Sequence, residues 1–284
     1  MPTSRFPIVT VVLIAINIAV FGWQLSFSGS EELTPAYPGV TERDANSIEY
    51  GAIPYRLTHP GKDCALGAET VSATSAEPGV VCEGSPQYDE AVRLSEEEPG
   101  IPPLEPLDAA PWWVTILTSM FMHGGILHIA FNMLFLWIFG NNIEDSMGRA
   151  KYVLFYLLAG VAAVYAQSGL DPDSTIPTIG ASGAVAGVLG AYLLLLPHAR
   201  VVTLIFIIFF VTVVEIPAYV LLGLWFVLQF LPAVGQVATP DLAGEGGVAY
   251  FAHVGGFVFG LALVKVFARR RPAFGGGGPR YPVY

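Results

Sequence analysis

Several long apolar runs set the strongest limit on how this chain can fold. A helix needs about 20 mostly apolar residues to cross the hydrocarbon core of a bilayer, and several runs here approach or exceed that length. Hydrophobic residues make up 54% of the sequence and charged residues 13%, whereas about a quarter of the residues of a soluble domain are charged. The sequence therefore predicts an all-α polytopic membrane protein.

The charged residues are unevenly distributed along the chain. Residues 28–111 contain sixteen Asp or Glu and four Lys or Arg, so this stretch more than accounts for the formal net charge of −10. It is rich in Pro, Gly, Ser and Glu, and such a composition buries too little apolar surface to order fully, above all in residues 59–106. We therefore predict an acidic, partly disordered loop over residues 28–111.

Cys64 and Cys82 are the only cysteines in the sequence, and both lie in this acidic loop. A disulfide is expected between them if the loop faces an oxidising compartment. Two unpaired thiols in a flexible loop are the alternative. The sequence alone leaves both interpretations open.

The apolar runs account for six membrane spans. We place these spans in residues 7–25, 125–139, 152–166, 182–197, 201–231 and 248–267. The fifth stretch is too long for one straight span, so it holds either one span and an interfacial segment or two spans. The resulting division is a first span with a short cytoplasmic tail (1–27), the acidic loop (28–111), a helical core with spans two to six (112–271) and a flexible cytoplasmic tail (272–284).

The basic residues decide between the two span counts. With six spans and a cytoplasmic N-terminus, the basic residues outside the acidic loop fall on the cytoplasmic side, as the positive-inside rule prefers. They include Arg5, Arg149, Lys151, Arg200, Lys265 and residues 269–271. A seventh span would move the cluster at 269–271 to the outer side. We therefore predict a multi-pass protein of the cell membrane with both termini cytoplasmic and the acidic loop outside.

The unusual polar residues of the predicted spans fall at one depth. Spans two, four and six all enter from the outer face, and each carries polar side chains near its first turns: His128 and Asn132, Ser182, and His253. At about 1.5 Å of rise per residue, they lie below the outer surface and above the midplane. Polar groups are costly inside a membrane, so a functional role is the default hypothesis.

Ser182 lies where the fourth span begins. A helix start offers unpaired backbone N–H groups and a partial positive charge, which suits a developing oxyanion. Glycines four residues apart let a neighbouring helix approach closely, and spans four and six both have such pairs: Gly183 and Gly187, and Gly256 and Gly260. Close approach would bring the Ser182 hydroxyl within reach of His253, the adjacent base that a nucleophilic serine requires. Taken alone, the segment is more typical of a packed helix with a capping serine.

Three motifs together resemble the rhomboid intramembrane serine proteases. They are His123-Gly-Gly-Ile-Leu-His128-Ile-Ala-Phe-Asn132, Gly180-Ala-Ser182-Gly183 and Ala252-His253-Val-Gly255-Gly256. The resemblance implies a six-helix bundle with a long outer first loop. It also implies a Ser182 nucleophile, a His253 general base and an oxyanion hole formed by the Ser182 backbone N–H with the His128 and Asn132 side chains. The expected partners are transmembrane protein substrates and the lipid bilayer. The resemblance implies that the protein uses no cofactor or metal and binds no nucleic acid.

Supporting roles are predicted for Gly180, Gly183 and His123. His123 precedes His128 by five residues, which favours a place near the site. The alternative is a residue at the end of a loop that holds the outer cap of the protein by a hydrogen bond.

Two positions depart from the family pattern. Many members have Tyr or Phe four residues after the serine, stacked on the base, whereas this chain has Ala186. Some carry Trp-Arg before the second span, whereas Trp112 and Trp113 are followed by no Arg. The first departure bears on the support of the His253 ring and the second on a structural loop. Neither removes a reacting group.

Three other functions are alternatives to the protease. Haem ligation by His128 and His253 would not call for a serine between small residues at a helix start. A metal site of His123 and His128 has neither the i, i+4 spacing nor the Glu of a zincin. A non-catalytic rhomboid-like protein that binds transmembrane helices usually lacks the serine or the base, and both are present here. The sequence favours the protease.

Overall fold

The computed structural model describes residues 6–27, 29, 37, 40–71, 76–98, 100–207, 210–238 and 248–268. The chain divides into two compact units. The first consists of Met1–Ile16, Ile126–Ala166 and Ala181–Tyr284, and the second of Asn17–Gly125 and Gln167–Gly180. Arg5, the basic cluster at 269–271 and the predicted tail at 272–284 lie outside the described residues.

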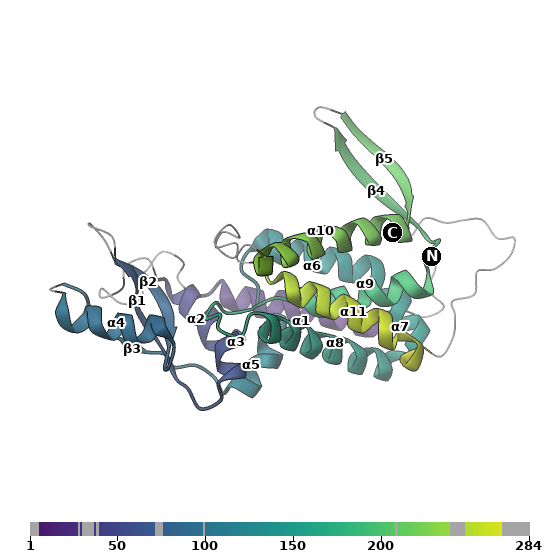
Figure 1. Ribbon diagram of the computed structural model, residues 1–284. Coiled ribbons are helices and arrows are strands. Elements are labelled where there is room, and N and C mark those ends of the chain that lie inside the picture. The colour runs from purple at the N-terminus through teal and green to yellow at the C-terminus, as the bar shows by residue number, and fades with distance from the viewer. Residues whose placement is uncertain are drawn as a thin grey trace, which may run out of the picture. The chain divides into compact units, whose positions relative to one another are not determined.

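Apolar helices make up most of the first unit (Figure 1). They are α6 (Ile126–Phe135), the π-helical turn η2 (Leu136–Gly140), α7 (Asn141–Met147), α8 (Arg149–Leu170), α9 (Ser182–Leu195), α10 (Ala218–Ala238) and α11 (Tyr250–Phe267). The continuous stretch Ile126–Met147, α8, α10 and α11 are each long and apolar enough to cross a membrane. α9 and α1 (Ile8–Gln24), which begins in this unit, are shorter apolar helices. The prediction of a mostly helical, polytopic membrane protein is confirmed.

The buried carboxylate of Glu144 in α7 holds the first turn of α1. It accepts hydrogen bonds from the backbone N–H groups of Val9 and Thr10, at 3.1 and 2.8 Å, and from the Thr10 hydroxyl at 2.8 Å. A negative charge at a helix N-terminus is further stabilised by the helix dipole. These contacts offset the cost of burying the carboxylate, and they join two segments that are far apart in sequence.

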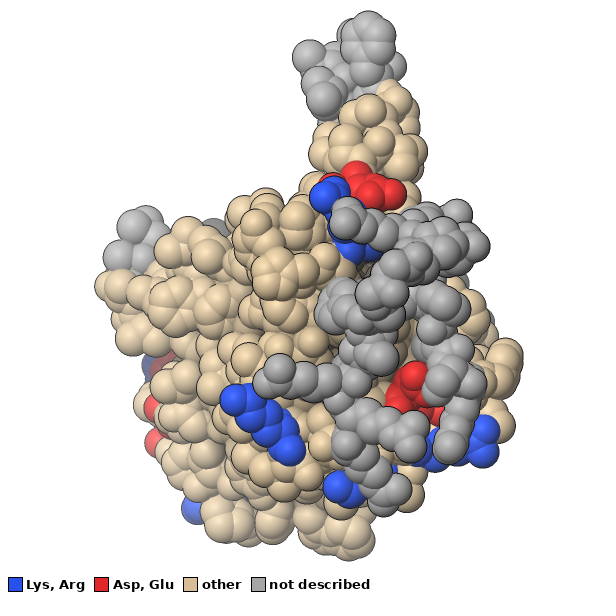
Figure 2. Space-filling model, turned by 90° about the vertical axis from the view of Figure 1, so that its right-hand side faces the viewer, with Lys and Arg blue, Asp and Glu red and all other residues tan. Residues whose placement is uncertain are grey.

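An antiparallel hairpin connects α9 to α10. Its strands are β4 (Arg200–Ile207) and β5 (Phe210–Pro217). The stretch 201–231 therefore holds a hairpin and one helix rather than two spans. Figure 2 shows the hairpin projecting, with charged atoms near its base, where Arg200 and Glu215 approach to 3.9 Å. The all-α expectation misses this sheet, because apolar length alone does not separate strands from helices, and the many Val, Ile and Thr residues here favour strands.

The second unit contains most of the acidic stretch. Its elements are α2 (Glu42–Tyr50), α3 (Pro54–Thr58), β1 (Cys64–Val71), β2 (Ala76–Cys82), α4 (Pro86–Glu97), β3 (Glu105–Pro106), α5 (Trp112–Thr118) and the 3-10 turn η1 (Ser119–Phe121). The three strands form an antiparallel sheet in the order β2-β1-β3. The Thr41 hydroxyl accepts a hydrogen bond from the Asp44 N–H and begins α2, and Ser85 caps α4 in the same way.

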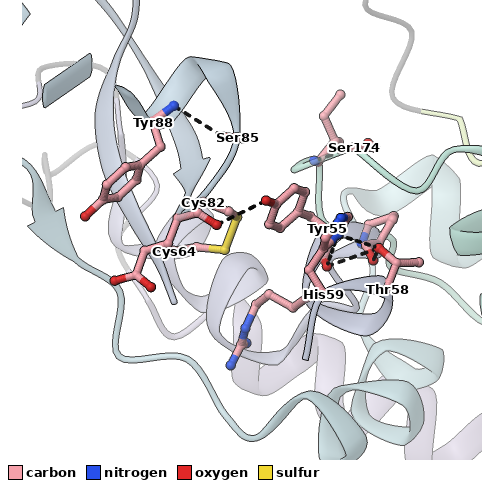
Figure 3. The surroundings of a disulfide bond; sticks show 12 residues. Tyr55, Thr58, His59, Cys64, Cys82, Ser85, Tyr88 and Ser174 are labelled. Carbon is pink, nitrogen blue, oxygen red and sulfur yellow. Dashed lines mark hydrogen bonds between the residues drawn. A yellow bond between two sulfur atoms is a disulfide. The ribbon is translucent and has the colours of Figure 1, made fainter. Parts of the chain in front are cut away.

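Cys64 and Cys82 form a disulfide between paired positions of β1 and β2 (Figure 3). The bond closes a sequence separation of 18 residues, which restricts the unfolded chain and stabilises the fold in the chain-entropy description. It belongs to a small hydrophobic core: Tyr37, Val40, Ile48, Ile53, Tyr55, Cys64, Leu66 and Cys82. The described part of residues 59–106 thus packs more than its composition indicates, because scattered apolar side chains gather around one covalent cross-link.

The polar turn that precedes Ser182 is held by backbone contacts within the second unit. Thr178 and Ala52 exchange two hydrogen bonds, at 3.1 and 2.8 Å, and the Tyr55 N–H donates to the Ser174 carbonyl at 3.0 Å. The Tyr55 hydroxyl donates to the Glu83 carbonyl at 3.1 Å, beside the disulfide (Figure 3). Burial is the main cause that raises the pKa of Tyr55, so this hydroxyl keeps its proton and its donor role.

Candidate active site

Ser182 is the first residue of α9, and the chain enters this helix through a glycine. Gly180 has a φ of +128°, a backbone conformation that glycine adopts at little steric cost. Its N–H donates to the Ser119 carbonyl at 2.8 Å. Ala181 occupies the N-cap position without a side-chain hydrogen bond. The first backbone N–H groups of α9 therefore have no partner from the helix itself or from a cap.

The Ser182 hydroxyl lies beside a ring nitrogen of His253. Its Oγ is 2.8 Å from Nε2, although the two residues are 71 positions apart in sequence. His253 is in the first turn of α11, and both side chains are partly buried. This is the hydrogen bond that a serine needs in order to pass its proton to a base during nucleophilic attack.

Glycines bring α9 and α11 together backbone to backbone. A Cβ added at Gly256 would overlap the carbonyl of Gly183, and one at Gly260 would overlap the carbonyl of Gly187. The two glycines of α9 also contact alanine side chains of α8. The glycine strips predicted on the fourth and sixth spans thus face each other, and this approach sets the distance between Ser182 and His253.

The second ring nitrogen of His253 has a partner that sequence analysis missed. Nδ1 lies 2.7 Å from Oε1 of Gln229, which is on α10. This partner is a neutral amide, 24 residues earlier in the sequence. The available signal was a polar side chain in the middle of a largely apolar span, which marks a functional candidate.

His128 and Asn132 lie one turn apart on α6. Asn132 is buried, and its Nδ2 donates to the backbone carbonyl of His128 at 3.0 Å. His128 is close enough to His253 for the two rings to interact electrostatically. The structure thus brings Ser182, His253 and His128 to one region of the first unit, with Asn132 beside His128.

His123 lies in the second unit and is almost completely buried. Its backbone N–H donates to the Gln24 side-chain oxygen at 2.9 Å, and the Gln24 amide donates to its carbonyl at 3.3 Å. Nδ1 lies 3.2 Å from the Phe121 carbonyl, and the ring meets Phe21 edge to face. These contacts fit the loop-anchoring interpretation. A supporting role at the site stays a prediction for His123, as it does for Gly180 and Gly183.

Comparison with known proteins identifies the family of this chain. The rhomboid domain model matches residues 110–270, which is more than half of the 284 residues. This chain belongs to the rhomboid family. The resemblance drawn from the three motifs is confirmed.

Several rhomboid proteins align with parts of the chain. "Rhomboid protein 1, mitochondrial" of Saccharomyces cerevisiae is 29% identical over 152 residues, which are 52% of this chain and 40% of that protein. "Rhomboid protease GluP" of Bacillus subtilis is 43% identical over 82 residues, 29% of this chain and 15% of that protein. "Presenilin-associated rhomboid-like protein, mitochondrial" of Mus musculus is 29% identical over 152 residues, 51% of this chain and 36% of that protein. The chain spans less than half the length of each of these curated relatives.

In this rhomboid domain, the aromatic side chain beside the His253 ring comes from α10 and not from the position four residues after the serine. Ala186 occupies that position, is fully buried and has no ring to stack. The indole of Trp225 on α10 lies 6.1 Å from the His253 ring, centroid to centroid. Trp225 and Gln229 are four residues apart, so they share one face of α10, and both approach the same imidazole.

Proposed function

We propose that this rhomboid is an intramembrane serine endopeptidase that hydrolyses peptide bonds in or near the transmembrane segments of membrane proteins. The observation that carries the proposal is the 2.8 Å contact between Ser182 Oγ and His253 Nε2 at the start of a helix in a membrane domain. A hydroxyl is a weak nucleophile until an adjacent base accepts its proton. The name of the aligned Bacillus subtilis relative, a rhomboid protease, supports the same class of reaction.

The proposed reaction proceeds through an acyl-enzyme. Ser182 Oγ attacks the scissile carbonyl carbon while its proton passes to His253 Nε2, and the carbonyl π electrons move to the oxygen. Collapse of this tetrahedral intermediate expels the amine, which takes the proton from His253. Water then repeats the sequence on the acyl-Ser182 ester, with His253 again as the base, and releases the new carboxylate.

The oxyanion is proposed to be stabilised by the uncapped start of α9 together with α6. The backbone N–H of Ser182 is one donor, and the side chains of His128 and Asn132 supply the others. The absence of a side-chain cap at Ala181 supports this assignment, because it leaves these N–H groups to meet a negative charge. One Asn132 amide hydrogen already bonds the His128 carbonyl, so its second hydrogen is the proposed donor.

The length of α9 supports a site below the membrane surface. With 14 residues the helix is about 21 Å long, shorter than the roughly 30 Å of the hydrocarbon core. If its C-terminal end reaches the cytoplasmic side, Ser182 begins the helix inside the outer half of the bilayer. Water would then reach the site through polar groups from the outer face.

We propose six spans formed by α1, the stretch Ile126–Met147, α8, α9, α10 and α11. In this topology both termini are cytoplasmic, the protein resides in the cell membrane, and residues 28–111 form the outer loop between the first span and the core at 112–271. The Cys64–Cys82 disulfide supports an outer loop, because disulfides persist in oxidising compartments. The expected substrates are single-span proteins whose helix is loosened near the outer face by small or helix-breaking residues.

Cleavage of a transmembrane substrate tests the proposed function directly. The purified protein in liposomes is expected to cut a model single-span substrate that carries a Gly-Ala-rich segment near its outer end. Ser182→Ala is expected to leave no detectable product, with an unchanged melting temperature. If the wild-type protein binds the substrate without cutting it, the result would refute the protease and favour a non-catalytic rhomboid-like binding protein. Equal cleavage by both proteins would remove Ser182 from the reaction.

Asn132→Ala is expected to lower kcat by about 10²–10³-fold with little change in KM, as for the loss of one oxyanion donor. Asn132→Asp is expected to restore nothing, because a carboxylate repels the oxyanion. Turnover and melting temperature are measured on the same preparation. If Asn132 only ties the helix together, the alanine variant melts earlier and yet turns over normally, which would contradict the oxyanion role.

A further inference from the structure

We propose that Gln229 is a positioning residue, which fixes the tautomer and orientation of the His253 ring in place of the carboxylate found in catalytic triads. This inference rests on the proposed function, since it concerns how the general base is prepared. It assigns a third side chain to a site that the sequence describes as a pair.

The ring of His253 is held at both nitrogens from two different helices. Nε2 lies 2.8 Å from Ser182 Oγ on α9, and Nδ1 lies 2.7 Å from Gln229 Oε1 on α10. Both distances are those of well-formed hydrogen bonds. The two nitrogens lie on opposite sides of the imidazole, so the pair of contacts fixes its rotation as well as its position.

The chemistry of an amide oxygen determines which nitrogen carries the proton. Oε1 of a glutamine can only accept a hydrogen bond, so the contact with Gln229 requires N–H at Nδ1. A neutral imidazole then has its lone pair at Nε2, where it accepts the Ser182 proton. The opposite tautomer would point an N–H at the serine and could not act as a base.

A neutral amide differs from a carboxylate in one respect. It selects the tautomer without adding a negative charge, so it stabilises the imidazolium of the transition state less. In an apolar helix such as α10, a buried carboxylate is also far more costly than an amide. Gln229 therefore supplies the orienting part of the triad role at a small desolvation cost.

A second contact from α10 supports the assignment. Trp225, one turn before Gln229, lies 6.1 Å from the His253 ring with an angle of 38° between the ring planes. Trp225 also lies 5.8 Å from Phe257 of α11. Ala186 leaves no aromatic ring on the α9 side. The base is thus positioned from α10, by a hydrogen bond and a flanking indole.

The other polar groups facing His253 leave this role to Gln229. Among the described residues, α9 contributes the Ser182 hydroxyl, α6 contributes His128 as the titratable group that interacts with the ring electrostatically, and α10 contributes Gln229. The His128 imidazole is neutral or cationic, so it cannot take the part that the aspartate plays in a catalytic triad. A change in the pH profile of a Gln229 variant is therefore read against His128 as the neighbouring titratable group.

Paired substitutions separate positioning from mere packing. Gln229→Met keeps the length of the side chain and removes the acceptor, and it is expected to lower kcat roughly 10- to 100-fold, part of the 10²–10⁴ that a positioned base contributes, with KM unchanged. Gln229→Glu is expected to keep kcat at its pH optimum within about threefold of wild type, since it still accepts from Nδ1, and to raise the pH of half-maximal activity. Gln236→Met on the same helix is the matched control. The two ring nitrogens of His253 are bonded to Ser182 and Gln229, so the loss of the Gln236 amide is expected to leave kcat unchanged.

The tautomer itself gives a readout that does not depend on activity. Protein with ¹³C,¹⁵N-labelled histidine is expected to show the Nδ1–H tautomer for His253, assigned by loss of its signal in His253→Gln. An Nε2–H tautomer in the wild-type protein would overturn the inference, even if Gln229→Met failed to fold. A wild-type protein that cleaves, with a Gln229→Met variant of equal kcat and pH profile, would overturn the inference and leave the protease intact. If the wild-type protein cleaves no substrate but His253 is the Nδ1–H tautomer, the result would refute the proposed protease function. It would still support the inference that Gln229 fixes the tautomer of the His253 ring.

Discussion

His253→Ala is expected to abolish the labelling of Ser182 by a fluorophosphonate probe and to lower peptide hydrolysis by about 10⁴- to 10⁶-fold. The reason is the single contact between Nε2 and Ser182 Oγ, at 2.8 Å. Without this imidazole the hydroxyl loses the base that contacts it, and the serine returns to the low reactivity of an alcohol. The helical fold is expected to persist, because the glycine contacts between α9 and α11 do not involve this side chain.

The matched control for this substitution is His198→Ala. His198 is exposed after α9 and contacts the ring of Tyr219, so its removal changes the histidine content and leaves the site untouched. Probe labelling is measured by mass spectrometry of the peptide that contains Ser182. Normal labelling and cleavage in a folded His253→Ala protein would show that another group activates the serine.

Gly256→Val is expected to cause the largest loss of stability. A Cβ at this position overlaps the backbone carbonyl of Gly183, and a backbone atom cannot move aside as a flexible side chain can. Overpacking a tight core costs about 1–3 kcal/mol, and more where the backbone must shift. α9 and α11 must therefore separate, so the variant is expected both to melt earlier and to lose probe labelling, because the same contact sets the distance from Ser182 to His253.

Gly223→Val on α10 provides the comparison. A Cβ at Gly223 has nothing within 4 Å, so the same change in size meets open space and is expected to alter stability by less than about 1 kcal/mol. Thermal unfolding of both variants in one detergent tests the difference. Equal melting temperatures would mean that α9 and α11 are not packed as closely as the structure has them.

The sequence predicted those features of the site that depend on spacing along a helix. Ser182 and His253 were paired because both lie in the first turns of spans that enter from one face, and the glycine repeats supplied a reason for close approach. Gln229 escaped prediction because its contact depends on the rotation of α10 about its axis. An almost uniformly apolar helix leaves that rotation undetermined until the neighbouring helices are placed.

The fold outside the site was less predictable for different reasons. Residues 200–217 are apolar enough for a helix or a strand, and only pairing of Val201 with Ile216 and of its neighbours along the hairpin decides for the strand. Cys64 and Cys82 were recognised, but their pairing depends on strand register, which composition does not contain. The hydrogen bonds of Glu144 to the first turn of α1 depend on tertiary contact alone, because more than 130 residues separate the partners in sequence.

The long separation between Ser182 and His253 has a consequence for biosynthesis. Because His253 follows Ser182 by 71 positions, α9 is translated and inserted well before α11 exists. Until α11 packs, the glycine strip of α9 faces no partner backbone and the Ser182 hydroxyl has no imidazole beside it. Under the proposed function, a nascent chain carries an inert alcohol, and the capacity to cut neighbouring membrane proteins arises only with the insertion of α11.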